Sequence, residues 1–494
     1  MEASFEELQD RFSRRISAGG PAELERGTIV VVPSLTFPAG ELRKITAIAH
    51  YEERLLATLL MLRDPSVRLI YVSSTEIDPA IIDYYLSFTP DPGDAGRRLR
   101  TISVGDATAR PLTEKLLDHP EVLQIIRAGA TGPDDAFIFP FNVTPAERSL
   151  AEAVGLPLFG PPPHLAGFGT KSGARVVARR AGVPVLEGSE DVRSLGDLER
   201  AVARLRARRP NARAVVVKLD NGFSGQGNAI IDLDGLRSPI DRSVTVFCAE
   251  EEAWSSFGPK IESEGAIVEE QVRVAGITSP SVQVRIVPGG TVELLSTHDQ
   301  VLGGPDDQVY LGCRFPARPE YRPLIEGYAL KVAARLADEG VIGLFGIDFV
   351  VIPERHGHGA YLSEINLRVG GTTHPFLMAR GVTGGSYDVS SGRLCADGRS
   401  ICYVATDNIK SDRYAGLSPA HAIDALAGAG LAYDDRTKSG AALHMLGALE
   451  RHGKIGATCL APTVDDAAAL HDDVIDVLDR LVERRGAATL EAPP

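Results

Sequence analysis

The sequence predicts an α/β N-terminal domain, followed by a larger α+β fold and a small C-terminal α+β region. Apolar strands alternate with helical patterns through roughly the first 155 residues, which is typical of an open, mostly parallel sheet. Strands then follow one another more closely after a Pro- and Gly-rich segment at 158–167. The chain has 494 residues, which is too long for one core and indicates two to four domains.

The N-terminal elements follow from hydrophobic periodicity and from helix-end signals. Pro145 in a first turn and Gly155 just past an end mark one helix clearly. No GxGxxG motif follows the first strand, so nothing marks a dinucleotide site. We expect strands over 28–33, 67–74, 99–105 and 135–143, and helices over 41–63, 79–88 and 145–155.

The rest of the chain predicts a second fold and a last region. We expect strands over 212–220, 265–272, 281–287, 291–298, 343–352 and 359–367, helices over 171–181 and 321–340, and further helices near 419–428, 441–451 and 465–485. The predicted domain division is 1–160, 161–394 and 395–494.

Composition excludes several classes of protein. The net charge is −14 and no basic stripe is present, which argues against a nucleic-acid partner. No apolar run approaches the eighteen or so residues of a membrane span, and the N-terminus lacks an apolar leader, so we expect a cytoplasmic protein. Five scattered cysteines without a CxxC pair argue against disulfides and structural zinc. The oligomeric state cannot be read from these patterns.

Alternating polar residues predict a metal site. Glu364, Asn366 and Arg368 stand at every second position of a strand, so they project to one face. The preceding strand carries Asp348 within the apolar run GLFGIDFVV, where a charge is costly unless it is paired or binds metal. Carboxylate and amide oxygens suit Mg²⁺, which usually accompanies a bound phosphate. The alternative is an edge strand with a polar solvent face, on which Glu364 pairs with Arg368.

Two lysines lie in settings that favour phosphate. Lys218 ends a valine strand and precedes a Gly-rich loop, whose backbone N–H groups can converge on phosphate oxygens. Lys171 opens a helix, and a helix N-terminus also favours an anion. The alternative in both cases is a lysine exposed to water. The loop residues of interest are Gly222, Ser224, Gly225, Gln226 and Gly227.

A strand that ends in two acids is the last element of this series. Glu269 or Glu270 could accept from an adenine amino group, with the following backbone, to Val272, along the ring edge. The alternative is the charged end of an ordinary strand.

Taken in order, these motifs resemble the ATP-grasp superfamily over residues 160–380. The resemblance implies an ATP cleft between two α+β subdomains, with a lid subdomain at about 212–275. Lys171 and Lys218 would contact the α- and β-phosphates, and Glu269 would lie near adenine. Gly225 to Gly227 would belong to the lid loop, Asp348, Glu364 and Asn366 would hold Mg²⁺ or Mn²⁺, and Arg368 would stabilise the acyl phosphate. The stretch 273–283 lacks the acid that many members use for ribose.

The whole chain is similar to stand-alone ligases with a pre-ATP-grasp N-terminal domain, of the pheganomycin-type peptide ligase group. The stretches 50–62, 296–317 and 370–375 carry this similarity. It implies that ATP phosphorylates a carboxylate and that an amine attacks the acyl phosphate, giving a peptide or γ-glutamyl amide in specialised metabolism. Competing hypotheses are an ATP-grasp kinase, a carboxylase, which would need a biotin site that is missing here, a non-catalytic ATP-binding protein, and a P-loop NTPase.

Several polar residues become candidates for holding small amino-acid or peptide substrates. Arg285, within an apolar strand, could reach phosphate as a catalytic residue, and Arg314 could hold a carboxylate. The remaining candidates are His298, Gln300, Gln308, His374 and His444, and for each histidine a structural role is an equal alternative.

Overall fold

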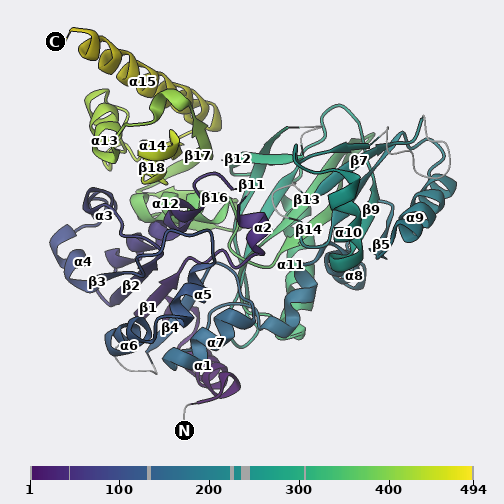
Figure 1. Ribbon diagram of the computed structural model, residues 1–494, viewed down its shortest axis with the longest axis horizontal. Coiled ribbons are helices and arrows are strands. Elements are labelled where there is room, and N and C mark those ends of the chain that lie inside the picture. The colour runs from purple at the N-terminus through teal and green to yellow at the C-terminus, as the bar shows by residue number, and fades with distance from the viewer. Residues whose placement is uncertain are drawn as a thin grey trace.

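Three β-sheets form the framework of the protein (Figure 1). The structure is a computed structural model, and it describes residues 3–43, 45–130, 135–222, 227–234, 245–304 and 308–491. Figure 1 shows the first sheet and its helices at the lower left, the five-stranded sheet at the right and the C-terminal helices at the upper left. Across the described ranges, no helix combines the length and the apolar character that a membrane span requires.

The first sheet confirms the predicted parallel α/β arrangement. Its strand order is β3-β2-β1-β4, and all of its neighbouring strands are parallel. Thr144 caps α7 and Gly155 ends it at a φ of 71°, so both ends of this helix match the sequence signals. The strands are β1 (Gly27–Val32), β2 (Val67–Ser73), β3 (Leu99–Ser103) and β4 (Ala136–Pro140); the helices are α1 (Phe5–Gly19), η1 (Pro21–Glu25), α3 (Pro79–Leu86), α4 (Pro92–Arg98), α5 (Leu112–Leu117), α6 (Pro120–Gly129) and α7 (Pro145–Val154).

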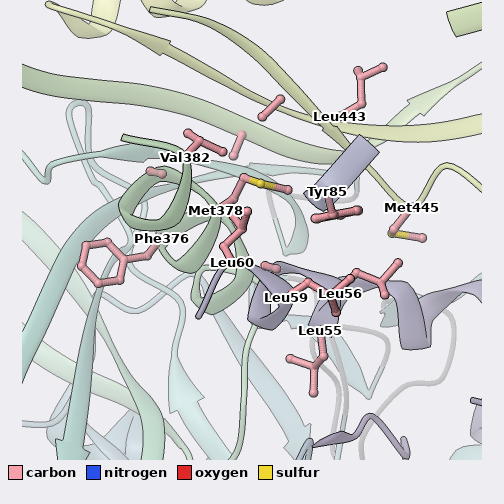
Figure 2. Packing of buried hydrophobic residues seen from close by; sticks show 14 of the residues in the cluster. Leu55, Leu56, Leu59, Leu60, Tyr85, Phe376, Met378, Val382, Leu443 and Met445 are labelled. Carbon is pink, nitrogen blue, oxygen red and sulfur yellow. The ribbon is translucent and has the colours of Figure 1, made fainter. Parts of the chain in front are cut away.

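The single helix predicted over 41–63 is wrong. A short helix, α2 (Ala39–Leu42), ends early, and a 3₁₀ segment, η2 (Ile48–Arg63), follows it. Ala47 between them has a φ of 62°, a left-handed conformation that an α-helix cannot contain. The segment is buried almost all round, so its leucines do not form one face of a surface helix. Figure 2 shows these leucines beside α12 (Thr373–Thr383) and the segment around Leu443 and Met445.

The five-stranded sheet holds the predicted Lys218 and Glu269 strands. Its order is β5-β9-β6-β7-β8, and each neighbouring pair is antiparallel. The strands are β5 (Gly188–Val192), β6 (Ala214–Leu219), β7 (Asn228–Asp232), β8 (Thr245–Phe247) and β9 (Ala266–Glu270), and the helices α9 (Leu195–Arg208) and α10 (Trp254–Glu264) pack on this sheet. Before it in the chain, η3 (Pro163–Gly169) and α8 (Lys171–Arg180) pack mainly against β14 (Gly357–Asn366) of the largest sheet. The lid bounds proposed from the sequence stay a prediction.

The largest sheet joins the middle of the chain to its C-terminal part. Its main path is β14-β13-β10-β11-β12-β17-β16-β15, and β19 extends it by pairing with β17 and β18. The strands are β10 (Pro280–Ile286), β11 (Val292–Gly303), β12 (Val309–Phe315), β13 (Gly343–Glu354), β14 (Gly357–Asn366), β15 (Ser386–Asp388), β16 (Arg393–Ala396), β17 (Arg399–Lys410), β18 (Gly440–His444) and β19 (Lys454–Ala461). Because β12 pairs with β17, the sheet is continuous across residue 394, and the domain division there stays a prediction.

The helix predicted over 441–451 is wrong. Residues Gly440–His444 form β18, which pairs with β19, and only Ala448–His452 is helical, as α14. The run is buried on both faces, and a short apolar run of this kind does not distinguish strand from helix. The other helices are α11 (Arg322–Asp338), η6 (Asp412–Tyr414), α13 (Pro419–Gly428) and α15 (Val464–Glu491).

Candidate active site

A cavity of about 1650 Å³ lies between the five-stranded sheet and the largest sheet. Its walls come from β6 and β9, from β10 to β14, from η2, and from β17 and β19. Cavities that hold a single small molecule measure roughly 300–1000 Å³, so this one has room for a nucleotide and further ligands.

Two carboxylates meet on one wall of the cavity. Asp348 on β13 and Glu364 on β14 are direct partners across the antiparallel pair. Asn366 lies two residues further along β14, and its Nδ2 donates to Asp348 Oδ2 over 2.8 Å. All three line the cavity, as the alternation in the sequence predicts. Together they present carboxylate and amide oxygens to one space, which is the donor set that a hard divalent cation prefers.

The neighbouring charges shift the pKa values of Asp348 and Glu364 in opposite directions. Burial, followed by the negative charge of Glu364, raises the pKa of Asp348 to about 6. Burial would also raise the pKa of Glu364, but the positive charges of Lys171, Lys218 and Arg368 outweigh it and lower that pKa. The wall therefore carries a carboxylate that holds its charge with difficulty in the absence of a cation.

The two predicted lysines reach the same region from the five-stranded sheet and from α8. Lys218 Nζ lies 2.8 Å from Glu269 Oε2 and donates to Ser363 Oγ over 3.2 Å, and Lys218 lines the cavity. Lys171 Nζ lies 3.5 Å from Glu364 Oε1 and donates to the carbonyl oxygen of Gly222. Lys171 is buried and does not line the cavity in the described part of the chain. Its contacts with Glu364 and Gly222 hold it behind the residues of the cavity wall.

Glu269 is engaged by two cations. Its Oε1 pairs with Arg175 Nη1 and its Oε2 with Lys218, while Glu190 binds the other side of Arg175. Sequence reasoning missed Arg175, which has no solvent exposure. The helical spacing could have identified it, because Arg175 stands four residues after Lys171 and therefore lies on the same side of α8. Glu270 and Val272 line the cavity next to Glu269, and their contact with adenine stays a prediction.

Arg368 follows β14 and lines the cavity. Its guanidinium carbon lies 5.7 Å from the centre of the Phe37 ring. Burial lowers the pKa of Arg368, although the negative charges of Glu364 and Asp348 oppose that effect. The predictions for Ser224, Gly225 and Gln226 lie outside the described residues, and Gly227 lies just before β7.

Three of the predicted substrate residues line the cavity, and one predicted catalytic residue does not. Gln300 and Arg314 line it, and Gln300 hydrogen-bonds to Asp348. Gln308 also lines it and accepts from Asn228 Nδ2 over 3.1 Å. Arg285 does not line the cavity in the described ranges. Its Nε donates to Glu293 Oε2 over 2.6 Å and its Nη1 lies 3.5 Å from Glu25, so these two acids neutralise it away from the cavity, and its catalytic role stays a prediction.

None of the three predicted substrate histidines lines the cavity in the described ranges, and their contact with a substrate stays a prediction. His298 is fully buried, its Nε2 lies 2.6 Å from Tyr403 Oη, and burial lowers its pKa to about 3. His374 Nε2 lies 2.8 Å and His444 Nδ1 lies 3.2 Å from the same oxygen of Asp407. Polar stretches in a sequence show that a histidine needs partners, but not whether protein or ligand supplies them.

Among the cavity residues that the sequence does not predict are two cations. Arg54, on η2, and Lys454, at the start of β19, both line the cavity. The stretch 50–62 contributes only to the family resemblance, and nothing in the sequence links it to residue 454.

Comparisons with known proteins agree with this geometry. A family model described as IQCH-like ATP-grasp matches residues 163–244 and 241–390, and one described as the PGM1 C-terminal domain matches residues 421–474. The chain is 33% identical over 453 residues to the L-propargylglycine--L-glutamate ligase of Streptantibioticus cattleyicolor, covering 89% of this chain and 92% of that protein.

Solved structures share the fold at low sequence identity. A biotin carboxylase from Campylobacter jejuni is 14% identical, with a TM-score of 0.57 and coverage of 92% of this chain and 94% of that chain. An N5-carboxyaminoimidazole synthetase from Staphylococcus aureus in complex with ADP is 13% identical, with a TM-score of 0.50 and coverage of 91% and 97%. The fold, the ordered cavity residues and the similarity to a curated ligase along most of the chain agree. The chain belongs to the ATP-grasp superfamily, and it is an ATP-dependent amide-bond ligase of that superfamily.

Proposed function

We propose that the protein joins the carboxylate of one amino acid to the amino group of a second amino acid or a peptide, through an acyl phosphate. The observation that carries this proposal is a single cavity lined by the strand partners Asp348 and Glu364, by Arg368 after the same strand, and by Lys218 of the five-stranded sheet. The relative from S. cattleyicolor is named for L-propargylglycine and L-glutamate. Amino acids are therefore the substrate class that we propose, with either the α- or the γ-carboxylate of glutamate as the activated group.

The donor set fits Mg²⁺, with Mn²⁺ as an alternative. Asp348, Glu364 and Asn366 would hold it, because they offer oxygens on adjacent strands, and because burial and the charge of Glu364 raise the pKa of Asp348 to about 6. A cation beside Asp348 would remove that unfavourable charge. When bound, the metal supplies positive charge to the phosphate oxygens of ATP.

The protein's own residues would then position the substrates and neutralise the negative charge of the phosphate chain and of the acyl oxygen. Lys218, already held by Glu269 and Ser363, supplies a fixed positive charge for the phosphate chain. A carboxylate oxygen attacks the γ-phosphorus, and ADP leaves. The amine nitrogen then forms a bond to the acyl carbon as the carbon–oxygen bond to phosphate breaks. Arg368 stabilises the negative charge that develops on the acyl oxygen, since a planar donor fork matches it.

The first experiment is a substrate screen with product identification. We expect ADP release from ATP and Mg²⁺ only when a suitable pair of amino acids is present, beginning with L-glutamate and small apolar L-amino acids. Mass spectrometry should find a product with the combined mass of the two amino acids less one water, which is the mass of their amide. We propose that this amide belongs to the synthesis of a specialised metabolite. A stable phosphorylated product without an amide would identify a kinase, and the absence of ADP release with every pair would contradict the proposal.

A further inference from the structure

Two cations from opposite ends of the chain meet on one tyrosine at the edge of the cavity. Lys454 Nζ donates to Tyr51 Oη over 2.8 Å and lies 4.9 Å from the centre of its ring. The guanidinium carbon of Arg54 lies 4.3 Å from the centre of the same ring. All three residues line the cavity. They come from η2 and β19, whereas the proposed phosphate and metal residues come from β6, β13 and β14.

Lys454 has no charge partner among the residues that the structure describes. Only 5% of the residue is exposed, and in the described ranges no carboxylate lies within ion-pair distance of its Nζ. A buried ammonium group is costly unless an opposite charge compensates it. The phenol of Tyr51 offers a hydrogen bond and a ring face, but no negative charge. An anion in the cavity would supply the missing charge.

Arg54 is buried, held in place and still able to donate. Its Nη2 lies 2.5 Å from Asp407 Oδ2, and only 8% of the residue is exposed. Its Nε, also buried, has no hydrogen-bond partner in the described part of the protein. A guanidinium fork with one side fixed on a carboxylate can present its remaining donors to a second, incoming carboxylate.

Asp407 is itself positioned by His374 and His444. Burial would raise the pKa of Asp407, but Arg54 and then His374 outweigh it and hold that pKa well below its ordinary range. Burial lowers the pKa of His374 to about 4, so this histidine is neutral near pH 7 and donates from Nε2. His374 and His444, two of the histidines that the sequence suggested as substrate ligands, therefore act through Asp407, which fixes Arg54.

The same three residues could be taken for a metal site, because one ligand atom from each of His374, Asp407 and His444 lies within 4.8 Å of the others. The guanidinium of Arg54 argues against that assignment. It occupies the second oxygen of Asp407 and places a full positive charge next to the space that a cation would need. Positioning of Arg54 accounts for the cluster without a metal.

The two cations differ in how the protein balances their charge. Asp407 pairs with Arg54, whereas Lys454 has only the hydroxyl and the ring of Tyr51 in the described part of the chain. The charge of Lys454 therefore remains to be balanced. One carboxylate in the cavity would balance Lys454 and could also accept from Arg54.

We propose that Lys454 and Arg54 form a subsite that binds the substrate carboxylate that is not phosphorylated, and so restrict the enzyme to amino-acid or peptide substrates with a free second carboxylate. This inference rests on the proposed function. The phosphorylated carboxylate must lie beside the ATP phosphates, at the wall with Lys218 and Glu364. The second carboxylate is free to occupy the Lys454–Arg54 end.

The test compares amino acids with their carboxamides in the wild type and in Lys454→Met. For L-glutamate these probes are isoglutamine, which lacks the α-carboxylate, and glutamine, which lacks the γ-carboxylate. We expect the wild type to prefer the substrate with both carboxylates over the analogue that lacks the unreacted one by about 10- to 100-fold in kcat/KM. Lys454→Met should lose a similar factor for the full substrate, mainly through KM, and should change little with the analogue. Lys331→Met, an exposed lysine on α11, is the matched control and should behave as the wild type.

The outcomes separate the two proposals. Equal losses with the full substrate and the analogue in Lys454→Met, or no loss with either, would overturn the subsite while the ligase function stands. If no pair supports ADP release, binding is measured by calorimetry with the same amino acids and amides. Carboxylate-dependent binding that Lys454→Met abolishes would then support the subsite without the ligase reaction. Binding that ignores the carboxylate would overturn it. The circular dichroism spectrum and unfolding midpoint of Lys454→Met check that it is folded, and Lys454→Arg, which keeps the charge, should recover part of the preference.

Discussion

Asp348 and Glu364 face each other as direct partners on the adjacent antiparallel strands β13 and β14. Both side chains are partly buried, and burial together with the charge of Glu364 raises the pKa of Asp348 to about 6. Such a pair is unfavourable in the empty protein and becomes favourable when a cation joins it. The relationship therefore links the stability of the ligand-free protein to the chemistry of the cavity.

The first prediction concerns this conflict between stability and activity. Because the pKa of Asp348 is about 6 when folded and 3.8 ordinarily, the charged form costs the folded state about 3 kcal/mol above pH 6, and the cost fades as the pH falls. Asp348→Asn should therefore stabilise the metal-free protein by about 3 kcal/mol at pH 7.5 but by only about 1 kcal/mol at pH 4.5, and should abolish amide formation. Urea unfolding with a chelator measures the gain. Asp338→Asn, an exposed change on α11, should show no such gain.

The second prediction concerns Arg368. Its proposed contact forms only as charge develops on the acyl oxygen, so Arg368→Lys should lower kcat by about 100-fold or more and leave the KM for ATP within about threefold. Steady-state ADP release with a fixed amino-acid pair measures both constants. Arg335→Lys, at a half-exposed ion pair on α11, serves as the control. A raised KM for ATP with an unchanged kcat would instead place Arg368 in nucleotide binding.

The third prediction concerns the buried ion cluster behind the cavity. Arg175 is completely buried between Glu269 and Glu190, so Arg175→Met should destabilise the protein by about 3 kcal/mol, because it leaves buried carboxylates with fewer partners. Arg179 also pairs with Glu190, but 47% of its side chain is exposed, and Arg179→Met should cost less than about 1 kcal/mol. Chemical denaturation compares the two. Equal costs would show that burial of the pair does not decide its contribution.

The fourth prediction concerns His298, which is buried against Tyr403 and does not line the cavity in the described ranges. Burial lowers its pKa to about 3, so the unfolded chain, with an ordinary value of 6.5, takes up a proton that the folded protein does not. The free energy of unfolding therefore decreases as the pH falls below 6.5, and His298 accounts for about 2 kcal/mol of that decrease between pH 7.5 and 5.0. His298→Gln should remove that part of the pH dependence and leave the KM values unchanged. His119→Gln, on the surface, should retain the wild-type slope. A His298→Gln variant with a raised KM for an amino acid would return this residue to the substrate site.

Much of the fold and part of the site followed from local patterns. The ends of α7, the parallel first sheet and the alternation along β14 were readable because capping residues and two-residue periodicity act over a few positions. The failures were also local in origin. The η2 and β18 segments are buried on nearly every side, so their hydrophobic periodicity does not mark one buried face. Without such a face, the pattern cannot distinguish a helix from a strand.

The sequence by itself determined which strand faces carry oxygens and which segments carry lysines, because the side-chain direction along a strand is set by the backbone. It did not determine which polar residues share a space. Lys454 and Tyr51 are 403 positions apart, and only the packing of η2 and β19 brings them together. The same packing placed Arg285 and His298 away from the cavity and brought Arg54 to it. Contacts of this kind depend on how separate sheets and buried segments stack, and that is decided by the balance of burial and charge across the whole molecule rather than by neighbours in the chain.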